Sequence, residues 1–223
     1  MNEIAYEHLH YRFNNIDLFW QALTHGSWVN ENGGHHKSYQ VFEFLGDAVL
    51  KLIQATILQE KHPDWSEGQL TQVRSSYENN KNLATWTQKL GIEYLIRHGK
   101  SINKKSSAWE QICAQVFEAV VGAIWIDCYY NFTVMIDIYK HWGFQIDEEK
   151  AISNPKKELQ EFVQSKKYGL PIYTIIKKDG PDHQPTFTVE CQIKDLNLFT
   201  RGQGKSIRDA EKSGAELMIE KLK

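Results

Sequence analysis

Apolar residues recur at helical spacing through residues 1–148, with polar residues on the faces between them. This spacing predicts helices that each bury one face. Such segments are 16–23, which follows Asn14 and Asn15, then 40–54, 112–126 and 129–146. In segment 40–54 the expected buried residues are Val41, Phe42, Leu45, Val49, Leu52 and Ile53. Capping boxes are predicted at Ser66 with Gln69 and at Ser107 with Glu110.

The pattern changes after residue 153. Asn154 and Pro155 predict the start of another helix. Alternating apolar and polar residues predict strands over 172–177, 186–193 and 198–201, and a last helix from Ser206. We therefore expect a multidomain chain, with an all-α domain over residues 1–148 and a small α+β domain of order α-β-β-β-α over residues 154–223.

Two of the predicted helices carry polar pairs among apolar residues. Glu43 and Asp47 are four residues apart beside Gly46, and Gln115 and Glu118 are three apart near Gly122. A glycine inside a helix costs about 1 kcal/mol relative to alanine, so it calls for a reason such as close helix packing. If the helices cross there, their oxygen atoms form a cluster suited to hard divalent cations such as Mg²⁺. The alternative is a solvated stripe on a core helix, made by Gln40, Glu43, Asp47, Lys51 and Gln54.

Residues 39–50, with the sequence YQVFEFLGDAVL, resemble the signature of the ribonuclease III family. The similarity continues through 67–75, 80–84 and 116–124, and residues 154–223 resemble a double-stranded-RNA-binding domain. The resemblance implies an endoribonuclease that binds double-stranded RNA and cleaves it by metal-dependent phosphodiester hydrolysis. It also implies 5′-phosphate ends, short 3′ overhangs, a role in RNA processing, including that of rRNA, and a homodimer with one active centre for each strand.

The resemblance also assigns roles to residues. It implies that Asp47 and Glu118 are catalytic, and that Mg²⁺, with Mn²⁺ as a possible substitute, binds the set Glu43, Asp47, Gln115 and Glu118. Glu67 falls on a supporting acid near the subunit boundary, although a carboxylate in the first turn of a helix also suits the helix dipole. Phe44 falls where the family packs an aromatic ring into the partner subunit; an ordinary core phenylalanine is the alternative.

Position 115 departs from the family pattern, because the family has an acid where this chain has Gln115. Losing a unit charge 4 Å from a cation weakens the attraction by at most about 4 kcal/mol per unit of cation charge at an effective dielectric constant near 20. A catalytically weakened or inactive dimeric double-stranded-RNA-binding protein is therefore an alternative function. A scaffold within a larger ribonucleoprotein is another.

Duplex RNA exposes 2′-hydroxyl groups in its minor groove and phosphates across its major groove. We expect Gln160, Glu161 and His183 to contact the 2′-hydroxyl groups. We expect Lys205, Arg208 and Lys212 to contact the phosphates. Solvated helix faces are the alternative, and Ile207 replaces a lysine that is usual in the family. Residues 1–153 carry 13 basic and 18 acidic side chains (−5), and residues 154–223 carry 13 and 10 (+3).

The remaining composition bounds the setting. No window reaches eighteen continuous apolar residues, and the first residues lack a basic region followed by an apolar run. Cys113, Cys128 and Cys191 have neither zinc-ligand nor redox spacing, so we expect reduced thiols in or near the core. These features predict a cytoplasmic protein that does not use a membrane, and the family resemblance implies no small-molecule substrate.

Overall fold

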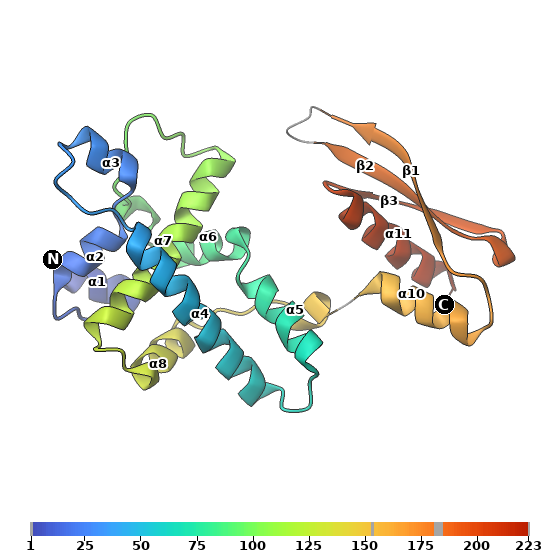
Figure 1. Ribbon diagram of the computed structural model, residues 1–223, viewed down its shortest axis with the longest axis horizontal. Helices are drawn as coiled ribbons and strands as arrows, with labels where there is room; N and C mark the ends of the chain where they lie inside the picture. Colours follow the sequence, from blue (N-terminus) through green and yellow to red (C-terminus); the bar gives the residue numbers. More distant parts are fainter. Residues whose placement is uncertain (1, 153, 181–184, 223) are drawn as a thin grey trace. The chain divides into compact units, whose positions relative to one another are not determined.

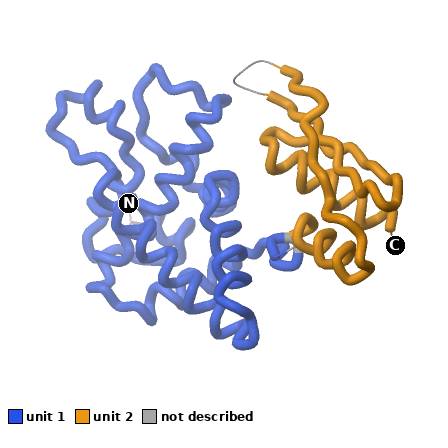
Figure 2. Tube along the Cα trace, turned by 45° about the vertical axis from the view of Figure 1, so that its right-hand side comes forward, with its two compact units in different colours: residues 1–152 blue, residues 153–223 orange. Residues whose placement is uncertain are grey.

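The computed structural model describes residues 2–152, 154–180 and 185–222. The chain divides into two compact units, residues 1–152 and residues 153–223, which Figure 2 shows in different colours. The described part of the first unit is helical, and that of the second combines helices with one antiparallel sheet. The expected fold class, an all-α unit followed by an α+β unit, is confirmed.

Most helices of the first unit follow one another through short connections, and longer loops precede α4 and α7 (Figure 1). They are α1 (Asn2–Leu9), α2 (Ile16–Ala22), α3 (Gly26–Glu31), α4 (Gln40–Lys61), α5 (Glu67–Tyr77), α6 (Asn80–Lys89), the 3₁₀ helix η1 (Glu93–Leu95), α7 (Ser107–Asp127), α8 (Phe132–Trp142) and α9 (Glu148–Ile152). Among the described residues, α7 is buried along most of its length, and α4 packs across it as its principal neighbour. This crossing organises the core of the first unit.

The crossing is close because a glycine lies on each helix. A Cβ atom on Gly46 of α4 would clash with the backbone of Glu118 and Gly122, and one on Gly122 of α7 would clash with the carbonyl of Phe42. The helix backbones therefore touch at this point, as the two mid-helix glycines predicted. Any larger residue would separate the helices and the polar side chains beside them.

The helices test the predicted capping boxes and helix ends. Ser66 and Gln69 form the expected capping box, with the Ser66 N–H 2.9 Å from Gln69 Oε1. The prediction of a capping box at Ser107 was wrong. Helix α7 begins one residue earlier than assumed, and its N-cap, Ser106, makes no side-chain capping bond. The predicted helix 129–146 is shorter, since Tyr129 and Tyr130 have positive φ and Gly143 ends α8 in the left-handed region.

The burial of α4 also differs from the prediction. Val41 and Leu52, expected in the core, are 70% and 53% exposed, whereas Gln54, which the solvated-stripe alternative placed in solvent, is 2% exposed. Gln54 is accommodated inside because its amide donates to the hydroxyl of Tyr139 on α8. An apolar stripe on the outward face of α4 follows the same period as a buried one, so periodicity alone could not separate the two.

The second unit contains α10 (Pro155–Ser165), β1 (Ile172–Asp179), β2 (Thr186–Ile193), the 3₁₀ helix η2 (Lys194–Leu196), β3 (Leu198–Gly204) and α11 (Ile207–Leu222). The strands pair in the order β1-β2-β3, all antiparallel, with Val189 opposite both Ile175 and Gly202. Asn154 caps α10 and Pro155 begins it, as predicted. The core joins both helices to the sheet through Leu159, Val163, Cys191, Ile193, Ala215 and Met218.

The three cysteines are free thiols, with Cys113 and Cys191 buried and Cys128 partly buried. Within the described residues, no helix is both long and apolar enough to span a bilayer.

Candidate active site

Four polar side chains gather where α4 crosses α7. Glu43 and Asp47 come from α4, Gln115 and Glu118 come from α7, and all four are partly buried. We call these residues the α4–α7 cluster. The interactions that link them are electrostatic, between Glu118 and both acids of α4, and hydrogen-bonded, between Gln115 and Glu43. The structure thus brings together the residues that the sequence predicted would converge.

The negative charges of the cluster disfavour one another. The pKa of Glu118 is raised to about 8, first because the carboxyl is buried and then because Asp47 and Glu43 lie nearby. Burial also raises the pKa of Glu43, and Asp47 adds to the rise, although a hydrogen bond from Gln115 opposes it. A cation bound among these oxygens would offset both the cost of burying charged carboxylates and the repulsion between them.

Two charged residues outside the predicted set extend this cluster. Lys51 donates to Asp47, with Nζ 2.7 Å from Oδ2, and this bond raises the pKa of the lysine. Glu78, at the end of α5, has a raised pKa. Burial is the main cause and the charge of Asp47 adds to it, whereas the charges of Arg74 and Lys51 oppose it. Lys51 could have been inferred from its position one turn after Asp47. Glu78 could not, because the packing of α5 on α4 brings it near.

Gln115 is held in a defined orientation. Its Oε1 accepts a hydrogen bond from the hydroxyl of Tyr39, with 2.8 Å between the oxygens, and its amide group bonds to Glu43. The oxygen that would serve as a ligand is therefore engaged by Tyr39. In this arrangement Gln115 acts on Glu43 as a neutral hydrogen-bonding partner and contributes no charge.

The donors of the α4–α7 cluster fit a hard divalent cation in kind, because they are carboxylate and amide oxygens. The side chains do not form a complete coordination sphere. In the described part of the chain, no three His, Cys, Asp or Glu residues are close enough together to hold one ion. Lys51 supplies positive charge to Asp47 instead. A cation bound at Asp47 would therefore compete with Lys51 for the charge of that carboxylate.

The predicted RNA-binding residues lie on the second unit. Gln160 and Glu161 are exposed on α10, and Glu161 is 3.7 Å from the ammonium of Lys157. His183 lies outside the described residues. Lys205, Arg208 and Lys212, which we call the basic face, lie just before or on α11 and make no ion pair with any residue the structure describes. The Ser206 hydroxyl caps α11 by accepting from the Asp209 N–H at 3.1 Å.

Comparison with known proteins places this arrangement in a family. Residues 15–136 match a family model described as Ribonuclease-III-like, and residues 155–222 match the Double-stranded RNA binding motif. The chain is 36% identical to Ribonuclease 3 of Francisella tularensis subsp. novicida, over 97% of this chain and 93% of that protein. The chain belongs to the ribonuclease III family. It is 34% identical to Ribonuclease 3 of Francisella philomiragia, over the same fractions of the two chains.

Solved structures agree with this ribonuclease III assignment. The nuclease domain of ribonuclease III from Campylobacter jejuni matches with a TM-score of 0.55 and 28% identity, over 65% of this chain and 97% of that one. A second structure of that domain, 26% identical over 64% of this chain and 95% of that one, also has a TM-score of 0.55; it is described for structural flexibility in a region involved in dimer formation. The first unit therefore has a ribonuclease III nuclease fold. This family of endoribonucleases generally depends on divalent metal ions.

Two further predicted residues of this ribonuclease III chain lie away from the α4–α7 cluster. Glu67 is exposed in the first turn of α5, where it accepts from the Thr71 hydroxyl at 3.0 Å, and it lines a separate groove beside Gln59 of α4. Phe44 is 80% exposed, so it is not a core residue within one protomer. With Val41 and Leu52 it forms an outward-facing apolar strip, here called the α4 stripe.

Proposed function

We propose that this protein is a Mg²⁺-dependent homodimeric endoribonuclease of the cytoplasm that cleaves double-stranded RNA by phosphodiester hydrolysis. Mn²⁺ would substitute for Mg²⁺, and the products would carry 5′-phosphates and short 3′ overhangs, as in RNA processing, rRNA included. The observation that carries the proposal is the convergence of Glu43, Asp47 and Glu118 at the crossing of two helices whose backbones touch.

Each residue of the α4–α7 cluster has a proposed role. Glu43, Asp47 and Glu118 would hold the metal, and Asp47 and Glu118 would also lie closest to the reacting phosphate. When bound, Mg²⁺ would supply an activated water and neutralise phosphate charge. Lys51 would exchange its bond with Asp47 for one with Glu78, which lies within its electrostatic reach. Glu67 would act as a supporting acid from α5.

Gln115 sets the strength of the site in this proposal. A glutamine at this position keeps Glu43 in place through its amide but leaves the cluster one negative charge short of four acids. We expect slow but measurable cleavage. If the missing charge instead abolishes activity, the protein is the alternative already stated, a weakened or inactive dimeric binder of double-stranded RNA.

Incubation of the full chain with long duplex RNA and Mg²⁺ tests the proposal. Cleavage should disappear in Glu118→Ala and persist in Glu110→Ala, an exposed acid on the same helix that serves as the matched control. Gln115→Asp should raise the rate. Binding without cleavage in the parent protein, with activity gained in Gln115→Asp, would establish the inactive alternative for the natural chain.

The homodimer is proposed from the α4 stripe. Its three apolar side chains lie on one face of the helix that carries Glu43 and Asp47, and burying them against a second copy would remove apolar surface from water. Phe44→Asp should convert a dimer into a monomer in analytical ultracentrifugation. Leu170→Asp, at an exposed leucine of the second unit, should leave the dimer intact.

The second unit would dock the duplex. Gln160, Glu161 and His183 would contact the minor groove, and the basic face would contact phosphates across the major groove. The support for this proposal is the family match of residues 155–222 together with three cations that form no ion pair with a described acid.

A further inference from the structure

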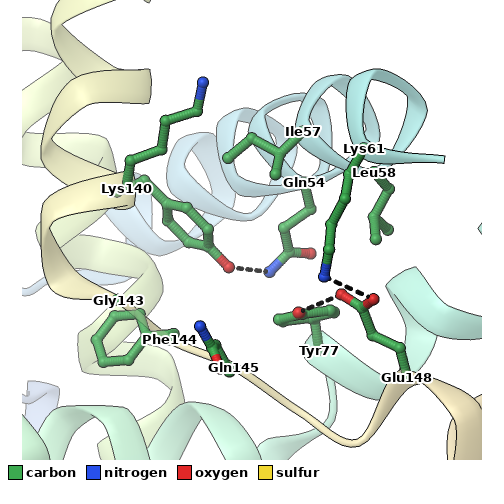
Figure 3. A pocket seen from close by; sticks show the side chains of 11 residues that line it. Gln54, Ile57, Leu58, Lys61, Tyr77, Lys140, Gly143, Phe144, Gln145 and Glu148 are labelled. Atoms are coloured by element: carbon green, nitrogen blue, oxygen red, sulfur yellow. Dashed lines mark hydrogen bonds and ion pairs between the residues drawn. The ribbon is translucent and has the colours of Figure 1, made fainter.

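A cavity of about 230 Å³ lies at the C-terminal half of α4, in the first unit. Figure 3 shows its lining from α4, α8, the segment 143–148 and the end of α5. Gln54, at its base, is seven residues beyond Asp47, which corresponds to about 10 Å along a helix. The cavity is therefore separate from the α4–α7 cluster. We call it the Gln54 cavity.

The base of the cavity presents a buried acceptor that lacks a partner. Gln54 is 2% exposed, and its Nε2 donates to the Tyr139 hydroxyl at 3.2 Å. Its Oε1 is buried without a hydrogen bond from any described residue, and Figure 3 shows the amide facing the cavity. Leaving a buried acceptor unsatisfied costs about 1–3 kcal/mol, so a donor placed here is favoured.

The neighbouring acid, Glu148, is a less available acceptor for a ligand than Gln54, because both of its oxygens already accept hydrogen bonds. Glu148 accepts from Lys61 and His62 at 2.8 Å each, and from the Tyr77 hydroxyl at 3.0 Å. Burial raises the pKa of Glu148, but these three hydrogen bonds outweigh it and leave the pKa below its usual value. A ligand therefore meets a carboxylate with three of its roughly four acceptor sites occupied, beside a Gln54 amide oxygen that has no described partner.

Aromatic and aliphatic side chains make the walls. The rings of Tyr139 and Phe144 meet edge to face, with centroids 6.1 Å apart, and Ile57 and Leu58 line the cavity from α4. Phe144 is held from behind by Trp86, stacked on it at 4.7 Å. The walls thus favour a flat, largely apolar ring system.

Two lysines, Lys61 and Lys140, lie at the mouth of the cavity, and Lys61 is paired there with the carboxylate of Glu148. Lys61 has a side chain 56% exposed and uses one N–H on Glu148, so two of the three donors of its ammonium group remain. Lys140, which extends away from the cavity in Figure 3, lies 3.6 Å from Glu60. An anionic group at the mouth would be stabilised chiefly by Lys61.

We propose that the Gln54 cavity binds a nucleotide, with the base against the aromatic walls, a base N–H donating to Gln54 Oε1, and the phosphate at Lys61. A nucleotide combines the three required features, which are a planar ring, a ring or exocyclic N–H, and an anion a few bonds away. The cavity is large enough for the base and part of the ribose, with the phosphate left at the mouth. Two sources share this chemistry: a free mononucleotide and an unpaired nucleotide at an RNA end.

Calorimetric titration of the full chain in EDTA tests the proposal without reference to cleavage. The ligands are the four ribonucleoside 5′-monophosphates, their nucleosides and inorganic phosphate. At least one monophosphate should bind more tightly than its nucleoside, and the nucleoside more tightly than phosphate. If no monophosphate binds at millimolar concentration, the proposal is overturned, whatever the nuclease activity.

Substitutions locate the binding. Gln54→Met keeps the size of the side chain, removes the acceptor and should weaken monophosphate binding about tenfold. Lys61→Gln should weaken the monophosphate and spare the nucleoside. Gln59→Met, on the exposed side of the same helix, is the matched control and should change nothing. Unchanged affinity in Gln54→Met would overturn the site.

Ile57→Trp provides a second test, because it fills the cavity from its wall and leaves Gln54 in place. It should abolish binding, while thermal unfolding confirms that each variant is folded. A blunt RNA duplex and the same duplex with one unpaired 3′ nucleotide separate the two sources. Weaker binding of only the overhanging duplex by Gln54→Met identifies an RNA end, and weaker binding of only the mononucleotide identifies a free ligand.

Discussion

The charged groups of the α4–α7 cluster interact strongly with one another, whereas those of the basic face do not. The acids of the cluster are partly buried, lie close together and alter one another's pKa values, as the raised pKa of Glu118 shows. Lys205 and Arg208 are exposed and form no ion pair with a described acid. Removing one member of the cluster therefore changes its neighbours, whereas removing one cation of the basic face should subtract a nearly independent contribution.

The largest expected effect comes from forcing the helices of the cluster apart. Gly46→Ala places a methyl group against the Glu118 carbonyl, so it should lower the free energy of unfolding by about 3 kcal/mol or more, despite the better helix propensity of alanine. Urea unfolding measures this loss. Gly68→Ala is the matched control, because nothing lies within 4 Å of its new Cβ atom. Equal stability of the two variants would show that the close crossing is not required.

The next effect depends on pH. The folded state raises the pKa of Glu118 from 4.5 to about 8, so the folded protein binds the proton more tightly and loses stability as the pH rises through this window. Glu118→Gln should therefore stabilise the metal-free protein by on the order of 2 kcal/mol at pH 9 and by almost nothing at pH 4.5, with solvent screening taken into account. Urea unfolding in EDTA at several pH values measures the difference. A gain that does not depend on pH would contradict the assigned cause.

The smallest effect belongs to the basic face. Arg208→Ala should weaken duplex-RNA binding about tenfold at low salt and reduce the slope of log affinity against log salt by about one unit, for every RNA sequence tested. Fluorescence anisotropy at several salt concentrations gives the slope. Lys194→Ala, an exposed cation elsewhere in the second unit, is the control. An unchanged slope in Arg208→Ala would argue against this docking face.

The sequence predicted the convergence of the acids because it contained both periodicity and glycines. Gly46 and Gly122 are costly in helices, and their contact at the crossing explains that cost. The strands of the second unit were also predictable, since Val189, Cys191 and Ile193 alternate with less buried residues along β2. The strand alternation and the glycine beside each polar pair are local in sequence, and the crossing itself was inferred from the matching pattern of the two helices.

The features that the sequence could not provide depend on distant partners. Gln54 is buried because Tyr139 of α8 accepts its hydrogen bond, and Glu78 acts on Asp47 because α5 packs on α4. Val41 and Leu52 repeat at the spacing of core residues yet face outward. The orientation of Gln115 likewise depends on the hydroxyl of Tyr39, 76 positions away.

Direct measurement of metal binding tests the central claim, that the acids at the helix crossing hold a divalent cation. Electron paramagnetic resonance of Mn²⁺ titrated into the protein at pH 8.5 gives the bound fraction without requiring cleavage. We predict saturable binding that is lost in both Glu43→Gln and Glu118→Gln, retained in Glu110→Gln and strengthened in Gln115→Asp. Mn²⁺ binding of equal strength in the parent protein and in Glu118→Gln would contradict the account.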